Sequence, residues 1–138
     1  MAEPDLGRFV AAQDRIYERA LAELRAGDKR SHWMWFVFPQ IAGLGSSPTA
    51  RTYAIRDLAE ARAYLAHPVL GPRLAECARA LLDVQGRTAA QILGYPDDLK
   101  LRSSMTLFAR AAEDPAVFQA VLDRYYDGEP DPATLDRI

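Results

Sequence analysis

The chain has 138 residues, of which 49% are hydrophobic and 26% are charged, and its formal net charge is −2. This length fits one domain of ordinary size, and the composition excludes a disordered chain, because disorder needs low hydrophobicity and a high net charge. The single cysteine, Cys77, excludes an internal disulfide and a cysteine cluster for zinc.

The clearest predicted element is the first helix. Apolar residues recur at helical spacing from Leu6 to Leu24, with Asp5 placed as an N-cap and Gly27 as the C-terminal stop. The run SHWMWFVF at 31–38 is either a buried strand or a short helix. We favour a helix capped by Ser31, because no other segment supplies a partner strand.

The rest of the chain is typical of short helices joined by short loops. The predicted spans are 48–56 after a glycine-rich loop, 57–67, 68–86, one turn at 88–93, 97–112, 115–126 and a last turn after 131. The sequence therefore predicts an all-α fold of about seven or eight short helices in a single domain, 1–138, with a core at about 5–126 and a C-terminal helical tail at 127–138.

Location, cofactors and partners follow from what the sequence lacks. No run reaches the roughly 18 apolar residues of a membrane span, and the N-terminus has no basic start followed by an apolar stretch, so we expect a cytoplasmic protein with no membrane partner. We find no phosphate-binding glycine motif and no paired histidine spacing, so we expect no cofactor and no metal. The pI of about 5.7 disfavours nucleic acid as a partner.

Residues 29–36 form the first candidate for a binding site. They combine two cations, a hydroxyl and an imidazole with both tryptophans of the chain: Lys29, Arg30, Ser31, His32, Trp33 and Trp35. A helix starting at Ser31 would direct free N–H groups at an anion, and an indole would offer a flat face to a base or a sugar. His32 is the only candidate general acid or base near neutral pH. The alternative is that the aromatic residues are core and the cations a solvated loop.

Residues 100–106, with the sequence KLRSSMT, form the second candidate. Serine and threonine are poor helix formers, and such local conflicts often mark functional sites. The candidate ligand-binding residues here are Lys100, Arg102, Ser103 and Ser104. The alternative is that Ser103, Ser104 and Thr106 are small residues that permit close helix packing.

Lysine usage connects the two segments. Of the seventeen basic residues, fifteen are arginines, and the two lysines are Lys29 and Lys100, one in each segment. Lysine is not interchangeable with arginine, because its ammonium is compact and its pKa shifts readily on burial. This distribution favours a shared role for the two lysines.

Three long runs also resemble the bacterial domain of unknown function 1810 family. They are FVAAQDRIYERALAELRAGDKRSHWMWFVFPQIAGLG, YAIRDLAEARAYLAHPVLGPRLAECARALL and ILGYPDDLKLRSSMTLFA. The resemblance implies an all-helical single domain and carries over no catalytic residue. Some members are labelled calpastatin, which this globular composition argues against, because calpastatin is a disordered inhibitor.

Two functions are compatible with these patterns. The first is binding of a small anionic, phosphate-bearing ligand, such as a nucleotide or an ADP-ribose-like molecule, in a basic and aromatic cleft formed where the two segments meet. The second is a non-enzymatic interaction or homodimerisation module that uses the aromatic segment 33–38. The sequence does not decide whether the protein is an enzyme, or its oligomeric state.

Overall fold

The structure, a computed structural model, describes residues 5–138. Residues 1–4, which belong to the predicted domain and to the N-terminus examined for a signal peptide, lie outside the described residues. The described part contains ten helices: α1 (Gly7–Asp14), α2 (Tyr17–Ala26), α3 (Met34–Val37), α4 (Pro48–Thr52), α5 (Leu58–Ala66), α6 (Leu70–Asp83), α7 (Ala89–Leu93), α8 (Asp97–Ala111), α9 (Ala116–Tyr126) and α10 (Pro132–Leu135).

The predicted all-α fold is confirmed. In residues 5–138 the β-structure is limited to one isolated parallel bridge between Ile41 and Ile55, so no sheet forms. The aromatic segment contains the helix α3, as favoured from the lack of a partner strand. No helix in the described part of the chain is both long and apolar enough to cross a membrane.

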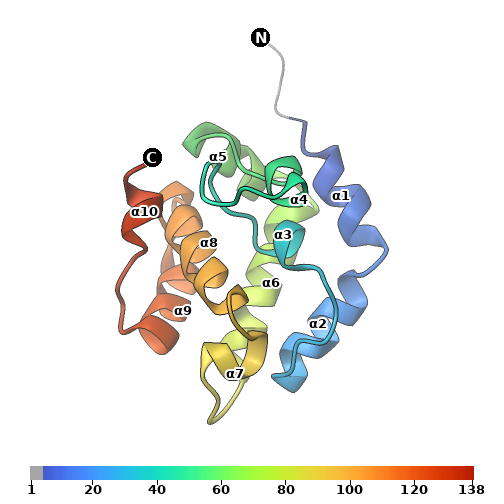
Figure 1. Cartoon of the computed structure of the whole chain (residues 1–138), viewed down its shortest axis with the longest axis vertical. Coiled ribbons are helices and arrows are strands. Elements are labelled where there is room, and N and C mark those ends of the chain that lie inside the picture. Colours follow the sequence, from blue (N-terminus) through green and yellow to red (C-terminus); the bar gives the residue numbers. More distant parts are fainter. Residues whose placement is uncertain (1–4) are drawn as a thin grey trace.

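Helices α6 and α8 hold the fold together (Figure 1). Helix α8 packs against α5, α7, α9 and α10, and α6 packs against α2, α5 and α9. Every residue of α8 from Ser103 to Phe108 is buried, because other elements surround that part of the helix. Ser103, Ser104 and Thr106 are therefore buried between helices, and the choice between a packing role and a functional role for them stays a prediction.

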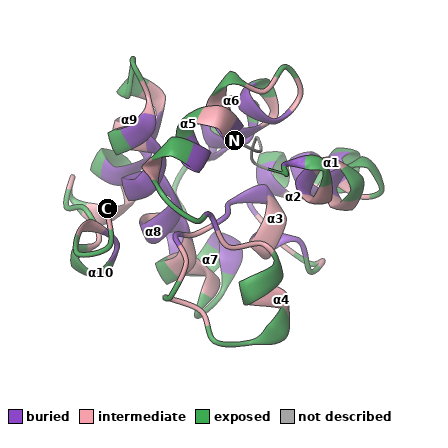
Figure 2. Cartoon of the chain, turned by 90° about the horizontal axis from the view of Figure 1, so that it is seen from above, coloured by how far each residue is buried: buried purple, intermediate pink, exposed green. Residues whose placement is uncertain are grey.

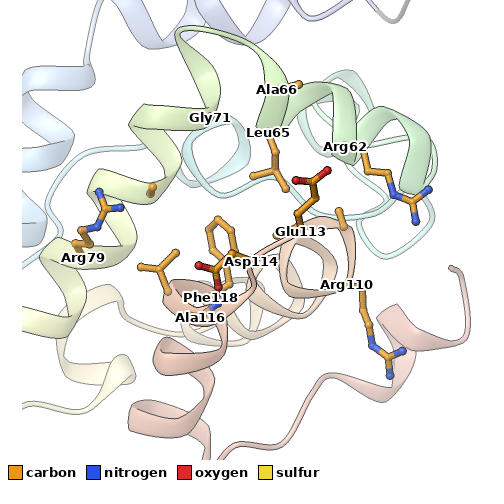
Figure 3. Close-up of a pocket in the computed structure, with 14 residues that line it drawn as sticks. Arg62, Leu65, Ala66, Gly71, Arg79, Arg110, Glu113, Asp114, Ala116 and Phe118 are labelled. Carbon is orange, nitrogen blue, oxygen red and sulfur yellow. Dashed lines mark hydrogen bonds between the residues drawn. The ribbon is translucent and has the colours of Figure 1, made fainter.

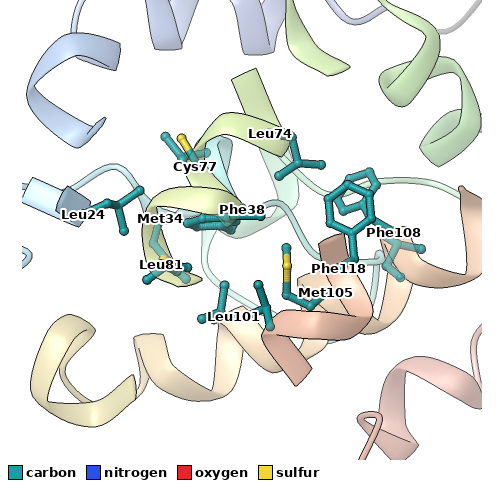
Figure 4. Packing of buried hydrophobic residues seen from close by; sticks show 14 of the residues in the cluster. Leu24, Met34, Phe38, Leu74, Cys77, Leu81, Leu101, Met105, Phe108 and Phe118 are labelled. Atoms are coloured by element: carbon teal, nitrogen blue, oxygen red, sulfur yellow. The ribbon is translucent and has the colours of Figure 1, made fainter. Parts of the chain in front are cut away.

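The buried side chains form one cluster on the faces that the helices turn toward each other (Figure 2). Figure 4 shows its centre, where residues of α2, α3, α6, α8 and α9 meet. Trp33, Phe38 and Phe108 are among its largest members and are at most 1% exposed. Full burial of a large apolar side chain contributes about 1.5–3 kcal/mol, so this cluster is the main stabilising feature of the fold.

The first predicted helix is broken in two, which corrects the single span expected from Leu6 to Gly27. Helix α1 ends at Asp14, and Ile16 leaves helical geometry with φ −134° before α2 begins. The break lets α1 pack against α3 while α2 packs against α6. Gly27 ends α2 in the left-handed region at φ 69°, as predicted.

Ser31 is not a helix cap, which corrects a second expectation. Helix α3 begins three residues later, at Met34, and Trp33 precedes it without a capping side chain. Helix α4 is also shorter than predicted, because it ends at Thr52 rather than near Arg56.

Asp5 is not the cap of the first helix either, because α1 has Leu6 as its N-cap and no capping side chain. Three other predicted caps are confirmed: Asp57 for α5, the Thr88–Gln91 capping box for α7 and Asp131 for α10. The capping side chains at these positions decide where each helix begins. Helix α7 in turn leads directly into the start of α8.

The C-terminal segment is anchored on α8. The Asp131 carboxylate accepts hydrogen bonds from the Ser103 hydroxyl at 3.0 Å and the Thr134 hydroxyl at 2.6 Å. The Asp131 N–H in turn donates to the Thr106 hydroxyl at 2.8 Å. Thr134 is fully buried. The division into a core at 5–126 and a tail at 127–138 stays a prediction.

Candidate functional site

The loop before α3 is organised around one carboxylate, Glu23 of α2. Its Oε1 accepts hydrogen bonds from the N–H of Arg30 at 2.9 Å, the N–H of Ser31 at 3.0 Å and the Trp33 indole at 2.9 Å. Its Oε2 accepts from the Ser31 hydroxyl at 2.7 Å. Burial alone would raise the pKa of Glu23, but these hydrogen bonds outweigh burial and lower it to about 2.

The two lysines meet at a single carboxylate, Asp97 in the first turn of α8. Lys29 Nζ lies 2.9 Å from Asp97 Oδ2, and Lys100 Nζ lies 3.7 Å from Asp97 Oδ1. The side chain of Lys29 is only 9% exposed, against 25% for Lys100 and 18% for Asp97. Two segments far apart in the sequence therefore converge on a site with two positive charges and one negative charge.

Each ammonium also lies beside a different indole. Lys29 Nζ is 5.3 Å from the centroid of the Trp33 ring, and Lys100 Nζ is 5.2 Å from that of Trp35. Both distances fall within the range of a cation–π interaction. Trp33 is fully buried, whereas Trp35 is half-buried. We call these five residues the lysine–tryptophan cluster: Lys29, Trp33, Trp35, Asp97 and Lys100.

Backbone contacts place the cluster. The Lys29 N–H donates to the Ile92 carbonyl of α7 at 2.8 Å, which ties the loop to the helix preceding α8. Asp97 and Lys100 are three residues apart on α8 and therefore lie on one face, where they can share a partner. Asp97 is also favoured at a helix start, because the dipole there is positive.

Space beside Lys100 is limited. A hollow of about 10 Å³ is lined by residues that include Trp35, Gln40, Tyr53 and Lys100. This volume holds about one water molecule, so no ligand-sized cleft is open at the cluster.

The other predicted site residues are distributed around the cluster. Arg30 is exposed and forms an ion pair with Asp28 at 2.8 Å. His32 is exposed, and its side chain makes no hydrogen bond with the described residues. Ser31 is engaged by Glu23. Apart from His32, the predicted anion donors of this loop are thus already bonded to carboxylates of the chain.

Arg102 and Ser103 of α8 bond to the C-terminal segment rather than to the lysine–tryptophan cluster. Arg102 donates to the carbonyl oxygens of Glu129 at 3.0 Å and Pro130 at 2.9 Å, and Ser103 donates to Asp131. Both side chains therefore hold the C-terminal segment.

Ser104 is fully buried, and its hydroxyl has no hydrogen-bond partner. The other buried side-chain atom of this kind in residues 5–138 is Asp98 Oδ1, also on α8. Ser104 follows Lys100 by four residues and so lies on the same face of the helix. A buried polar atom without a partner is costly, so each one calls for an explanation, of which a functional role is one.

The comparisons with known proteins cover almost the whole chain. The sequence pattern of the family described as "Protein of unknown function (DUF1810)" matches residues 3–138. The chain belongs to this DUF1810 family. No curated protein shows significant similarity to it.

The structure is also similar to a solved one, the crystal structure of the conserved hypothetical protein Rv1873 from Mycobacterium tuberculosis. The two share 57% sequence identity over 96% of this chain and 94% of that chain, with a TM-score of 0.94. The comparisons therefore establish the DUF1810 fold and assign no activity.

Three residues at or beside the site are not among the ligand-binding residues predicted from the sequence. The pattern predicts Asp97 only as a helix start, offers Trp35 only as an alternative to Trp33 for a flat surface, and does not single out Glu23. The spacing of three residues between Asp97 and Lys100 is a local pattern that pairs oppositely charged side chains on a helix. It could have found Asp97, whereas nothing local indicates that Glu23 binds the loop.

Proposed function

We propose that this protein binds a small anionic, phosphate-bearing ligand, such as a nucleotide or an ADP-ribose-like molecule, at the lysine–tryptophan cluster. One observation carries the proposal: the chain's two lysines converge on Asp97, each beside an indole. The single carboxylate leaves one positive charge uncompensated in a partly buried place, where a charge interacts more strongly than in water.

Lys100 is the ammonium that contacts the ligand. Lys29 is almost buried and close to Asp97, so its role is to fix the carboxylate. The Lys100 contact is longer, at 3.7 Å, and its side chain is the more exposed. Lys100 can therefore turn from Asp97 toward an external anion at little cost.

The ligand binds at the surface of the cluster rather than in a deep cleft, because the hollow beside Lys100 holds only about one water molecule. Its phosphate lies against Lys100, and a flat group, such as a base, stacks on the exposed part of Trp35. The unpartnered Ser104 hydroxyl, on the same helix face, supports a functional role for this part of α8.

Burial argues against the aromatic segment 33–38 as an interaction or dimer surface. Four of its six residues are at most 2% exposed: Trp33, Met34, Val37 and Phe38. Only Trp35 and Phe36 are half-buried, so little apolar area remains for a partner.

A thermal-shift screen against nucleotides, sugar phosphates and ADP-ribose tests the proposal. A ligand at about ten times its Kd adds about 1.4 kcal/mol of stability. For a chain of this length that raises the melting temperature by about 5 °C. Lys100→Gln should abolish this rise and leave the melting temperature without ligand unchanged. A screen with no shift, or a Lys100→Gln variant that binds like the wild type, refutes the proposal.

Asp97→Asn tests the same proposal with a change that should raise the ligand affinity instead of lowering it. Asp97 competes with the external anion for Lys100, so removing its charge should tighten binding while Lys100→Gln weakens it. Arg15→Gln, which removes an exposed cation at the end of α1, is the control and should change neither binding nor stability. Weaker binding by a folded Asp97→Asn variant would show that the carboxylate helps to hold the ligand.

A further inference from the structure

A wide concave region of the described chain lies away from the lysine–tryptophan cluster. It is a groove of about 960 Å³ between the α5–α6 turn and the start of α9 (Figure 3). Small-molecule sites have volumes of about 300–1,000 Å³, so this groove has the size of a ligand site. Apolar residues line its middle, including several alanines and Phe118.

Three arginines from three different helices border this groove: Arg62 of α5, Arg79 of α6 and Arg110 of α8. All three are exposed, and none forms an ion pair or a side-chain hydrogen bond with the described residues. By contrast, Arg8 and Arg73 elsewhere have carboxylate partners within 4 Å. The guanidinium donors at the groove are therefore free for an external acceptor.

The charges follow an order along the groove. In Figure 3, Arg79 lies on one side, Arg62 and Arg110 lie on the other, and Glu113 and Asp114 lie between them. The Asp114 carboxylate accepts a hydrogen bond from the Ala116 N–H at 3.0 Å, which fixes it at the α8–α9 turn. The groove thus presents positive charge at both ends and negative charge in the middle.

The geometry points to a second ligand site, which takes an elongated small molecule with an anionic group at each end. A carboxylate or phosphate at one end pairs with Arg79, and its counterpart pairs with Arg62 and Arg110. The apolar body lies over the alanines and Phe118. The two acids disfavour negative charge in the middle of the ligand, which excludes a polyanion such as nucleic acid.

Calorimetric titration of the full chain tests this site with matched pairs of probes. One series consists of straight-chain dicarboxylates from succinate to sebacate, and the other consists of the monocarboxylates of the same lengths. The best-fitting dicarboxylate should bind about ten-fold more tightly than its monocarboxylate, because only the former reaches both ends. Equal affinities, or no binding by any dicarboxylate, overturn the inference.

Arginine variants test the two ends of the groove separately. Arg79→Gln should lower the affinity of the best dicarboxylate about ten-fold and leave its monocarboxylate within about two-fold. Arg62→Gln combined with Arg110→Gln should weaken both probes. Arg19→Gln, an exposed arginine on α2, is the control. An unchanged dicarboxylate affinity in Arg79→Gln overturns the inference.

All of these arginines are exposed, so the variants should melt at the wild-type temperature. Lys100→Gln should retain dicarboxylate binding, because the groove does not include Lys100. Loss of dicarboxylate binding in a folded Lys100→Gln variant would show that the probes bind at the lysine–tryptophan cluster, and would overturn the groove site. The groove and the cluster are therefore tested independently.

Discussion

Replacing Glu23 by glutamine tests whether one carboxylate organises the loop that carries Lys29. In the folded chain this carboxylate accepts four hydrogen bonds, from the N–H groups of Arg30 and Ser31, the Ser31 hydroxyl and the Trp33 indole. Glutamine has nearly the same shape and keeps one acceptor oxygen. It removes the charge and places an amide N–H₂ group opposite a donor, so it isolates the electrostatic part of the interaction.

The magnitude follows from the pKa of Glu23, which falls from 4.5 to about 2 on folding. At 1.36 kcal/mol per pKa unit, this difference amounts to about 3 kcal/mol as an upper bound. Solvent screens a half-buried group, which reduces the contribution to about 2 kcal/mol. The amide oxygen retains part of the hydrogen bonding, so Glu23→Gln should cost about 1–2 kcal/mol near pH 7.

The direction in which folding shifts the pKa of Glu23 decides whether the stabilisation by this carboxylate is lost at low or at high pH. Because folding lowers the pKa of Glu23, the unfolded state binds the proton more readily. The stabilisation is therefore fully present above pH 4.5 and is lost as the pH falls toward 2. About three fifths of it should be gone by about pH 3.

Urea unfolding followed by tryptophan fluorescence measures this effect, because the Trp33 indole itself donates to Glu23. The gap in unfolding free energy between wild type and Glu23→Gln should be widest near neutral pH and should shrink below about pH 4. Glu18→Gln, an exposed glutamate on the same helix, is the matched control and should show almost no gap at either pH. A gap that stays constant with pH would refute the reasoning.

Lys29→Met should cost about 1–2 kcal/mol in urea unfolding, because it leaves the partly buried Asp97 without its closer partner, whereas Lys100→Met should cost under about 1 kcal/mol. Equal losses would contradict these assignments. Cys77 should react with Ellman's reagent only after unfolding, because burial raises the pKa of its thiol to about 12; rapid labelling of the folded chain would disagree. Thr106→Val should cost about 1–3 kcal/mol by removing the acceptor of the Asp131 N–H, while Ser104→Ala should be neutral or stabilising. A larger loss in Ser104→Ala than in Thr106→Val would show that the Ser104 hydroxyl has a partner.

Local chemistry made much of the fold predictable from the sequence. Helix ends set by a glycine or a capping side chain, such as Gly27, Asp57 and the Thr88–Gln91 pair, lie where the pattern placed them. The break after Asp14 was not predictable in this way, because the apolar spacing continues through it. It arises from packing, since the two halves contact different helices.

The candidate site was predictable only in part for the same reason. The rarity of lysine indicated that Lys29 and Lys100 belong together, and the structure places both at Asp97. The composition contained no information about the carboxylate between them. The hydroxyl residues Ser103 and Thr106, which the sequence also offered as signs of a functional site, have a structural role. Both side chains form hydrogen bonds with Asp131 of the C-terminal segment.

Most of the donors that the sequence predicts for an external anion are hydrogen-bonded or ion-paired to carboxylates of the chain itself. Glu23 accepts from Ser31 and the neighbouring N–H groups, and Asp97 lies closest to Lys29. A donor already satisfied inside the fold can bind a ligand only by losing its internal partner, and that loss is subtracted from the affinity. Ligand binding should therefore depend on cations that folding leaves incompletely paired. By this criterion Lys100, held at 3.7 Å from a shared carboxylate, and the free arginines of the groove are the sites to test, whereas Lys29 and Ser31 maintain the structure around them.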